Sequence, residues 1–162
     1  MSIPAQPVEI RSFPRDGTAN KTIYFMPLQQ LSLWPEKISL PSRHFGVLLL
    51  CDGNAIPDST VVNLASRMLS QGLAYLCAWG PDCERIHDLF DEAIIENPND
   101  LIKSDSVIMT TSHDEPLEDA VWYFLYLTVG AGEYWKTCQS WIVVPVERAD
   151  WTEKARLLAL EL

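Results

Sequence analysis

The feature that most constrains this chain is an alternation of continuous apolar runs with amphipathic segments from residue 44 onward. Four apolar runs are predicted to be strands, at residues 45–51, 73–79, 106–111 and 140–146. An unbroken apolar run is typical of a strand covered on both faces. The segments between the runs have helical spacing. Strands that alternate with helices in this way indicate βαβ units and a parallel sheet.

Capping residues predict where the helices begin and end. They predict four helices. The first has Asp58 or Ser59 as its N-cap and Gly72 as its stop, and the second has Pro81 at its first position. The third begins at Pro116 and spans 116–131, and the last has Asp150 and Glu153 as a capping box. Right-handed crossovers then place helices on both faces of the sheet. We expect a small doubly wound (Rossmann-like) three-layer α/β sandwich with a mainly parallel central sheet and strand order 2-1-3-4.

Residues 1–43 differ from the rest because six prolines interrupt them. Long regular elements are therefore not expected there. The stretch KTIYFMPL, residues 21–28, predicts a short edge strand that ends before Pro27. We interpret residues 1–43 as a proline-rich N-terminal arm packed on a single α/β domain, residues 44–162.

The charge balance restricts the partners. Twelve Lys and Arg residues stand against 22 Asp and Glu residues, which gives a net charge of −10. No basic stripe is visible, so the sequence argues against nucleic acid and against an anionic membrane surface. The first residues lack an export signal, no run approaches the roughly 18 apolar residues of a membrane span, and the four cysteines form no close pair. A cytoplasmic location is expected.

Polar residues gather at the carboxyl ends of three predicted strands, in loops 51–54, 79–83 and 110–115. In an open parallel sheet these loops lie at one edge, which is where such folds bind ligands. The candidate binding residues at this edge are Asp52, Trp79, Asp82, Thr110, Thr111 and Glu115. The alternative is that Asp82, Asp114 and Glu115 only cap the helices that follow. Capping does not explain why Trp79, Cys83 and His113 gather at the same edge.

Two motifs carry a resemblance to a known family. AYLCAWGPDC and the later VIMTTSHDEPLEDAVWYFLYL resemble a bacterial family of unknown function with A-W-G-x-D-C and V-M-T-T-x-H-x-D-E motifs. The likeness covers about residues 44–145. It implies that the family pattern includes Trp79, Asp82, Cys83, Thr110, Thr111, His113 and Glu115. The chain is one residue short between His113 and Glu115, which leaves the place of Asp114 in the pattern open. The resemblance implies a site without assigning an activity.

Three kinds of chemistry are compatible with the cluster. Cys83 in the first turn of a helix is placed for a lowered thiol pKa, and a catalytic set of Cys83, His113 and Asp114, or Asp52, would suit a thiol-dependent hydrolase or transferase. Carboxylates at positions 52, 82, 114 and 115 are an alternative set for Mg²⁺, but no lysine directly follows the fourth strand and no second acid lies two residues after Asp52. Zinc bound by Cys83, His87 and His113 is disfavoured, because the spacing of Cys83 and His87 gives a single half-site, so no metal is predicted. Neither G-x-G-x-x-G nor a P-loop is present, so no cofactor is predicted.

The third predicted helix has a second apolar stripe. Trp122, Tyr126 and Val129 lie on a different face from the stripe that should cover the sheet, and Tyr134 and Trp135 extend it. A helix that is apolar all round is buried on each side. We expect the N-terminal arm, or else a protein partner or a second copy of the chain, to cover Trp122 and Tyr126.

Two functional hypotheses follow. The first is a cytoplasmic protein-binding or regulatory domain, like a small acidic immunity or adaptor protein. It depends on the acidity, the second stripe and the missing cofactor motifs. The alternative is the small thiol-dependent hydrolase or transferase that uses Cys83 and His113.

Overall fold

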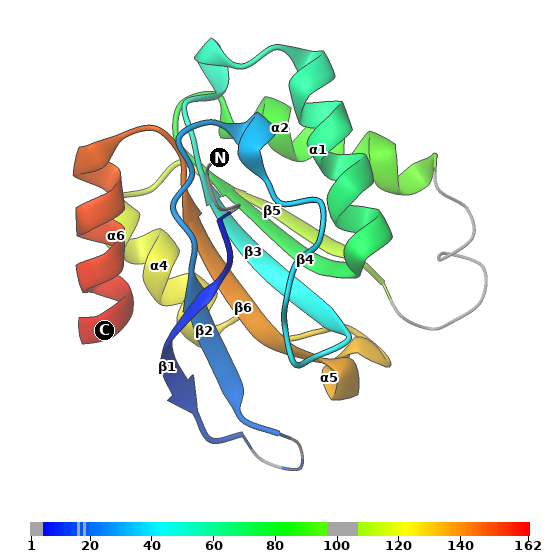
Figure 1. The fold of residues 1–162 in the computed structure, drawn as a ribbon, viewed down its shortest axis with the longest axis vertical. Helices are drawn as coiled ribbons and strands as arrows, with labels where there is room; N and C mark the ends of the chain where they lie inside the picture. Colours follow the sequence, from blue (N-terminus) through cyan, green and yellow to red (C-terminus); the bar gives the residue numbers. More distant parts are fainter. Residues whose placement is uncertain (1–4, 16, 18, 97–106) are drawn as a thin grey trace.

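The computed structural model describes residues 5–15, 17, 19–96 and 107–162. Within these ranges, six strands form one sheet in the order β1-β2-β6-β3-β4-β5 (Figure 1). The strands are β1 Val8–Phe13, β2 Lys21–Phe25, β3 His44–Leu50, β4 Leu73–Trp79, β5 Met109–His113 and β6 Cys138–Pro145. Only β1 pairs antiparallel, with β2, and the other pairs are parallel. The predicted α/β fold with a mainly parallel sheet is confirmed.

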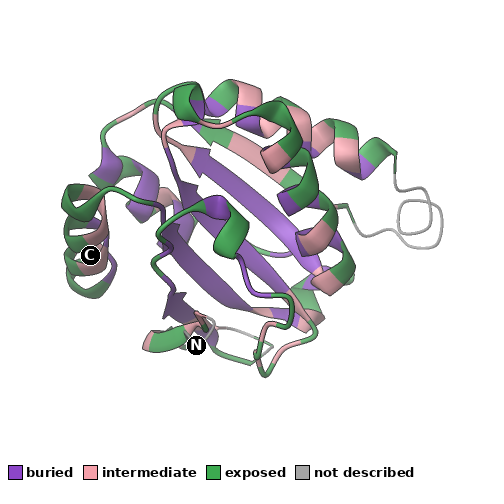
Figure 2. Ribbon diagram, turned by 45° about the horizontal axis from the view of Figure 1, so that its top comes forward, coloured by how far each residue is buried: buried purple, intermediate pink, exposed green. Residues whose placement is uncertain are grey.

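Helices cover both faces of this sheet. The helices are α1 Asp58–Gln71, α2 Cys83–Ile95, α4 Leu117–Tyr126, α5 Tyr134–Thr137 and α6 Ala149–Glu161, with short 3₁₀ turns at Leu31–Leu33 and Gly53–Ala55. One face packs against α1 and α2, and the other packs against α4 and α6 (Figure 1). Figure 2 shows the inner strands buried between these layers. Among the described residues, no helix has both the length and the apolar character needed to cross a membrane.

The predicted strand order is wrong. The order 2-1-3-4 would place the strand that contains Thr110 beside the one that contains Val47. Instead β3 lies between β4 and β6, and β5 lies at the edge beyond β4. Burial explains the difference, because β6 is almost completely buried while β5 exposes several of its residues. A strand with half-polar composition is tolerated at an edge, whereas an apolar one needs neighbours on both sides.

The N-terminal arm is part of the sheet. The predicted edge strand exists as β2, but it pairs with both β1 and β6, so it is an inner strand and β1 is the edge. Further along, Trp34 is 2 % exposed and its indole nitrogen donates to Gln71 Oε1 of α1 at 2.7 Å. Two aromatic-rich segments of the arm are thus anchored, one to the sheet and one to α1.

Several helix starts differ from the predicted caps. Gly72 ends α1 as expected, with φ 109°. At the start of α1, however, Pro57 occupies the N-cap position without a side-chain cap. Helix α2 begins at Cys83 rather than at Pro81, because Asp82 adopts the left-handed conformation and fills the N-cap position. Proline at 81 therefore lies in the turn that leads into the helix.

The two later helices also depart from expectation. Helix α4 ends at Tyr126, five residues before the predicted end at 131. The expected capping box of α6 does not form, since Arg148 occupies the N-cap position. Asp150 pairs with Arg148 and Glu153 pairs with Arg156, and both pairs are exposed on the surface. Local ion pairs have replaced the predicted cap.

Candidate functional site

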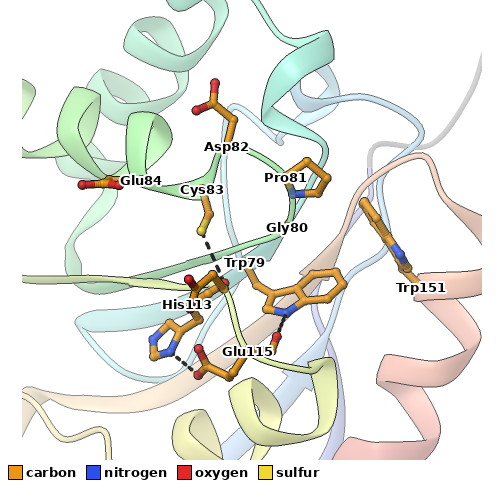
Figure 3. A pocket seen from close by; sticks show the side chains of 10 residues that line it. Trp79, Gly80, Pro81, Asp82, Cys83, Glu84, His113, Glu115 and Trp151 are labelled. Carbon is orange, nitrogen blue, oxygen red and sulfur yellow. Dashed lines mark hydrogen bonds and ion pairs between the residues drawn. The ribbon is translucent and has the colours of Figure 1, made fainter.

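A cavity of about 540 Å³ opens at the carboxyl edge of the sheet (Figure 3). Its lining residues are Trp79, Gly80, Pro81, Asp82, Cys83, Glu84, His113, Asp114, Glu115 and Trp151. Strands β4 and β5 are parallel and pair Trp79 with His113, which brings the loops that follow them together. The expectation that Cys83 and His113 lie at the same edge of a parallel sheet is confirmed. We call this cavity the carboxyl-edge pocket.

Two tryptophans form aromatic walls of the carboxyl-edge pocket. The rings of Trp79 and Trp151 lie 5.1 Å apart and are almost perpendicular, at 81°. The indole nitrogen of Trp79 donates to the backbone oxygen of Glu115 at 2.8 Å, which fixes that ring. The guanidinium of Arg148 stacks on Trp151 at 4.3 Å. Sequence reasoning missed Trp151, although its place just after the end of the last strand was a usable signal.

His113 is the last residue of β5 and is buried. Its Nδ1 lies 2.7 Å from Glu115 Oε1, and its Nε2 lies 2.8 Å from Thr111 Oγ1. A carboxylate can only accept, so Nδ1 carries a proton, and in the neutral ring Nε2 accepts the proton of the Thr111 hydroxyl. The ring also packs against Tyr123 of α4 at 4.5 Å. Both ring nitrogens are therefore engaged away from the thiol of Cys83.

Cys83 does not form the predicted catalytic set with His113 and Asp114. Cys83 is 6 % exposed, and its thiol donates to the backbone oxygen of His113 at 3.3 Å, not to the imidazole (Figure 3). Burial raises the pKa of Cys83, and the nearby charges of Asp114 and Glu115 add to the increase. This direction is opposite to the lowering expected from the helix start. Desolvation and two carboxylates outweigh a dipole equivalent to about half a charge.

The carboxylates of the pocket fall into two groups. Asp82 points away from the indole rings (Figure 3), and its carboxylate accepts from Arg85 Nε at 2.7 Å. Arg85 also bonds to Asp58 of α1 and to the Gly53 carbonyl, which holds three loops of this edge together. Glu84 and Asp114 are exposed, and neither has an ion pair within the described ranges. The uncompensated charge at the rim is negative.

The residue sets considered as alternative metal sites are not assembled among the described residues. Asp52 does not line the pocket and instead accepts from the amide of Asn54, so the four acids proposed for Mg²⁺ do not converge. His87, proposed as a zinc ligand, points to other partners on α2. Its ring nitrogens contact Asp88 at 3.1 Å and Asp91 at 3.4 Å. These three residues form a metal-capable cluster within the described part of the chain, and sequence reasoning did not identify it.

The two threonines of β5 point in opposite directions. Thr111 bonds to His113, as described above, whereas Thr110 bonds to the Asp91 carboxylate of α2. Neither lines the carboxyl-edge pocket. Alternation along a strand explains this, because successive side chains lie on opposite faces. Their observed contacts orient the edge strand and its histidine.

Trp122 and Tyr126 lie on α4, outside the carboxyl-edge pocket. Their side chains are 47 % and 42 % exposed, and their rings lie 5.8 Å apart. The arm reaches only Tyr126, through the Phe13 ring at 5.5 Å and a hydrogen bond from Arg11 at 3.2 Å. The expected cover by the arm is therefore only partial.

Comparison with known proteins gives one match. A family model described as a domain of unknown function (DUF7684) covers residues 27–160. No curated protein matches the chain. All residues of the carboxyl-edge pocket lie inside the matched range.

Proposed function

The chain belongs to the DUF7684 family, a domain of unknown function, and we propose that it is a cytoplasmic domain that binds a basic protein partner. A lysine or arginine side chain of the partner enters the carboxyl-edge pocket. One observation carries the proposal: the pocket combines two perpendicular tryptophan walls with unpaired carboxylates at its rim. Among its described lining residues there is no lysine or arginine.

A cation gains energy from each of these features. A cation held within about 6 Å of an indole face is stabilised by roughly 0.5–2 kcal/mol, more when it is desolvated. Arg148 already stacks on Trp151, which demonstrates that this ring accepts a guanidinium. The charges of Asp114 and Glu115 act inside the pocket, because they add to the increase in the pKa of Cys83 that burial causes. The same field attracts a cationic side chain.

The net charge favours a different protein over a second copy of the chain. Each copy carries −10, so two copies repel each other at long range, whereas a basic partner is attracted. Complementary charge mainly accelerates association and excludes wrong partners. The half-exposed Trp122 and Tyr126 offer an additional apolar contact surface.

A thiol-dependent hydrolase or transferase is the second candidate, because Cys83 lines the same pocket. The binding function has better support. The thiol donates to a backbone carbonyl, burial raises its pKa, and both nitrogens of the His113 ring have other partners. A nucleophile needs a base within hydrogen-bond reach, and the ring nitrogens of His113 already bond to Thr111 and Glu115.

The test uses three short peptides that differ only in the central residue: acetyl-Ala-Lys-Ala-amide, the arginine equivalent and the glutamine equivalent. Binding is followed by NMR on the indole N–H signals of the full chain. We expect the lysine and arginine peptides to shift the signals of Trp79 and Trp151. Trp151→Leu should weaken binding about 2–30-fold, which is the range of a cation–π contact.

Two matched control variants test whether the lysine peptide binds at the carboxyl-edge pocket or is attracted only by the acidic surface of the whole chain. Trp122→Leu removes another half-exposed tryptophan, and Asp119→Asn removes another exposed acid. Both should bind the lysine peptide like the unmodified chain, whereas Asp114→Asn should bind it more weakly. Equal binding of the glutamine peptide, or equal losses in the control variants, would contradict the proposal.

A further inference from the structure

A second cavity, of about 270 Å³, lies at the opposite edge of the sheet, where the N-terminal arm meets the end of α4. Its lining residues are Phe13, Pro14, Arg15, Lys21, Leu125, Tyr126, Thr128 and Val129. We call it the arm pocket. Among the described residues, the charged groups that line it are both cations, Arg15 and Lys21, and no described carboxylate lines it. In a chain with a net charge of −10, this local excess of positive charge needs an explanation.

Arg15 has unused hydrogen-bond donors. Its Nη1 and Nη2 are buried and have no hydrogen-bond partner. The guanidinium stacks on the Trp135 ring at 4.2 Å, which holds its plane in place. Burial lowers the pKa of Arg15. Buried donors of a charged group are costly without an acceptor, and nearly all such groups in native proteins are paired. The paired fork of Arg15 matches the two oxygens of a carboxylate.

Lys21 contributes charge rather than free donors. The residue is 4 % exposed, and its Nζ donates to Phe124 O at 2.8 Å, Thr128 O at 2.8 Å and Thr128 Oγ1 at 2.9 Å. The ammonium also lies 4.4 Å from the centre of the Trp141 ring. All these partners are neutral, so they satisfy its three hydrogens without cancelling its charge. The positive potential of the arm pocket is left for a ligand.

We propose that the arm pocket binds a small carboxylate with an apolar body. The carboxylate accepts two hydrogen bonds from Arg15 Nη1 and Nη2, and Lys21 adds its charge in its protonated form. The apolar part lies against three hydrophobic side chains: Phe13, Leu125 and Val129. The cavity is smaller than the roughly 300–1,000 Å³ usual for drug-sized ligands, so the ligand is small. This site is separate from the carboxyl-edge pocket.

Hexanoate is the probe, titrated into the full chain and followed through the indole signals of Trp135 and Trp141. Hexan-1-ol has the same apolar body without charge, hexan-1-amine has the opposite charge, and inorganic phosphate has charge without an apolar body. We expect hexanoate to bind more tightly than each of the three. Arg15→Gln should weaken hexanoate binding about tenfold or more, because two charge-assisted hydrogen bonds are lost.

Arg11→Gln is the matched control. Arg11 belongs to the same arm, stacks on Phe13 at 4.1 Å and bonds to Tyr126, but it does not line the arm pocket. This variant should bind hexanoate like the unmodified chain. Equal weakening in Arg11→Gln and Arg15→Gln, equal binding of hexan-1-ol, or no binding of hexanoate would overturn the proposal. Phosphate binding as tightly as hexanoate would also overturn it, because the apolar walls would then be unused.

The melting temperature without ligand gives a second measurement. Nη1 and Nη2 of Arg15 have no acceptor among the described residues, so Arg15→Gln should melt no lower than Arg11→Gln, which loses two hydrogen bonds. Hexanoate should raise the melting temperature of the unmodified chain and leave that of Arg15→Gln almost unchanged. A markedly lower melting temperature for Arg15→Gln without ligand would show that Arg15 is paired within the chain, and the site would be rejected.

Discussion

The carboxyl-edge pocket and the arm pocket lie at opposite edges of one sheet, and their charges are opposite. Helix α4 runs between them, since Glu115 immediately precedes its first turn and Leu125 lies in its last. Acids at the start of a helix and cations at its end both match the helix dipole. Part of this contrast therefore stabilises α4. In particular, Lys21 donates to the carbonyl of Phe124 in the last turn of α4 and to the carbonyl of Thr128 just after the helix.

The two pockets also differ in the charged groups that do not interact with α4. At the carboxyl edge, Glu84 and Asp114 keep free negative charge beside aromatic walls. In the arm pocket, the Arg15 fork keeps free donors beside apolar walls. The matched family range includes the whole carboxyl-edge pocket but begins after Arg15 and Lys21. The two proposed sites thus differ in the charge of the ligand expected, and one lies inside the family match while the other lies partly outside it.

The largest expected effect tests how rigid the two regions are. Gly80 in the carboxyl-edge pocket has φ 121°, and a Cβ there would overlap the carbonyl oxygen of Cys51. Gly17 in the arm has φ 75° with nothing within 4 Å of an added Cβ. Gly80→Ala should lower the free energy of unfolding by about 3–5 kcal/mol, and Gly17→Ala by about 1 kcal/mol. Urea denaturation measures both. Equal losses of stability in the two variants would show that the positive φ alone causes the effect and that the overlap with the Cys51 carbonyl adds nothing.

The next effect concerns the buried amine of the arm pocket. Lys21→Ala removes three hydrogen bonds, takes away the ammonium donor of the Phe124 and Thr128 carbonyls and opens a cavity. The free energy of unfolding should fall by about 3 kcal/mol. Lys136 is exposed, and Lys136→Ala should change stability by less than about 0.5 kcal/mol. Similar urea midpoints for the two variants would show that Lys21 does not stabilise the end of α4.

The pH dependence of stability follows from the same amine. Burial lowers the pKa of Lys21 from 10.5 to about 7, and the charge of Arg15 adds to this effect. Between these pH values the unfolded chain binds the extra proton, so stability rises with pH. We expect a gain of about 1.5 kcal/mol between pH 7 and pH 8.5, measured by urea denaturation. Lys21→Met should lose this gain. If the free energy of unfolding of Lys21→Met rose with pH as steeply as that of the unmodified chain, other groups would be the cause of the gain.

The pH window has an upper limit because of the buried thiols. Burial raises the pKa of Cys51, Cys77 and Cys138 from 9.0 to about 12. Above about pH 9 the unfolded chain loses these protons first, so stability falls with pH there. The pH dependence of the free energy of unfolding is therefore measured below pH 8.5, where these thiols contribute less than Lys21.

The smallest effect tests whether the carboxyl-edge pocket is a binding or a reactive site. Burial raises the pKa of Cys83, so iodoacetamide at pH 7 should alkylate it at least a few-fold more slowly than N-acetylcysteine. Mass spectrometry quantifies the rate, and the urea-unfolded chain provides the accessible reference. Alkylation faster than the free thiol would instead support the thiol-dependent enzyme.

Much of the fold could be predicted from periodicity. Along the first predicted helix, the apolar residues at helical spacing are Val61, Ala65, Met68 and Leu69, and all four are buried in the structure. The strand order could not be predicted, because apolar runs identify strands without naming their neighbours. The mixed polarity of β5, with Met109 and Ser112 exposed, was the available signal for an edge.

The candidate site could be predicted only in part. The rule that ligands bind at the carboxyl edge placed Trp79, Cys83 and His113 in one pocket correctly. The catalytic set was not predictable from proximity, since β5 continues through His113 and turns its ring toward Tyr123. Side-chain direction depends on where a strand ends, and such boundaries are the least certain part of a sequence-based assignment.

The sequence by itself determined the strands and the longer helices of residues 44–162, the buried faces of those strands, and which loops share an edge, but it did not predict β1. These properties follow from local backbone preferences and from the period of the apolar residues. Only the tertiary structure decided which groups are left without a partner. Nη1 and Nη2 of Arg15 become buried donors without a partner because the described groups around them, Trp135, Lys21 and the end of α4, offer no acceptor. Pairing of this kind depends on contacts between residues more than one hundred positions apart, which no local pattern specifies.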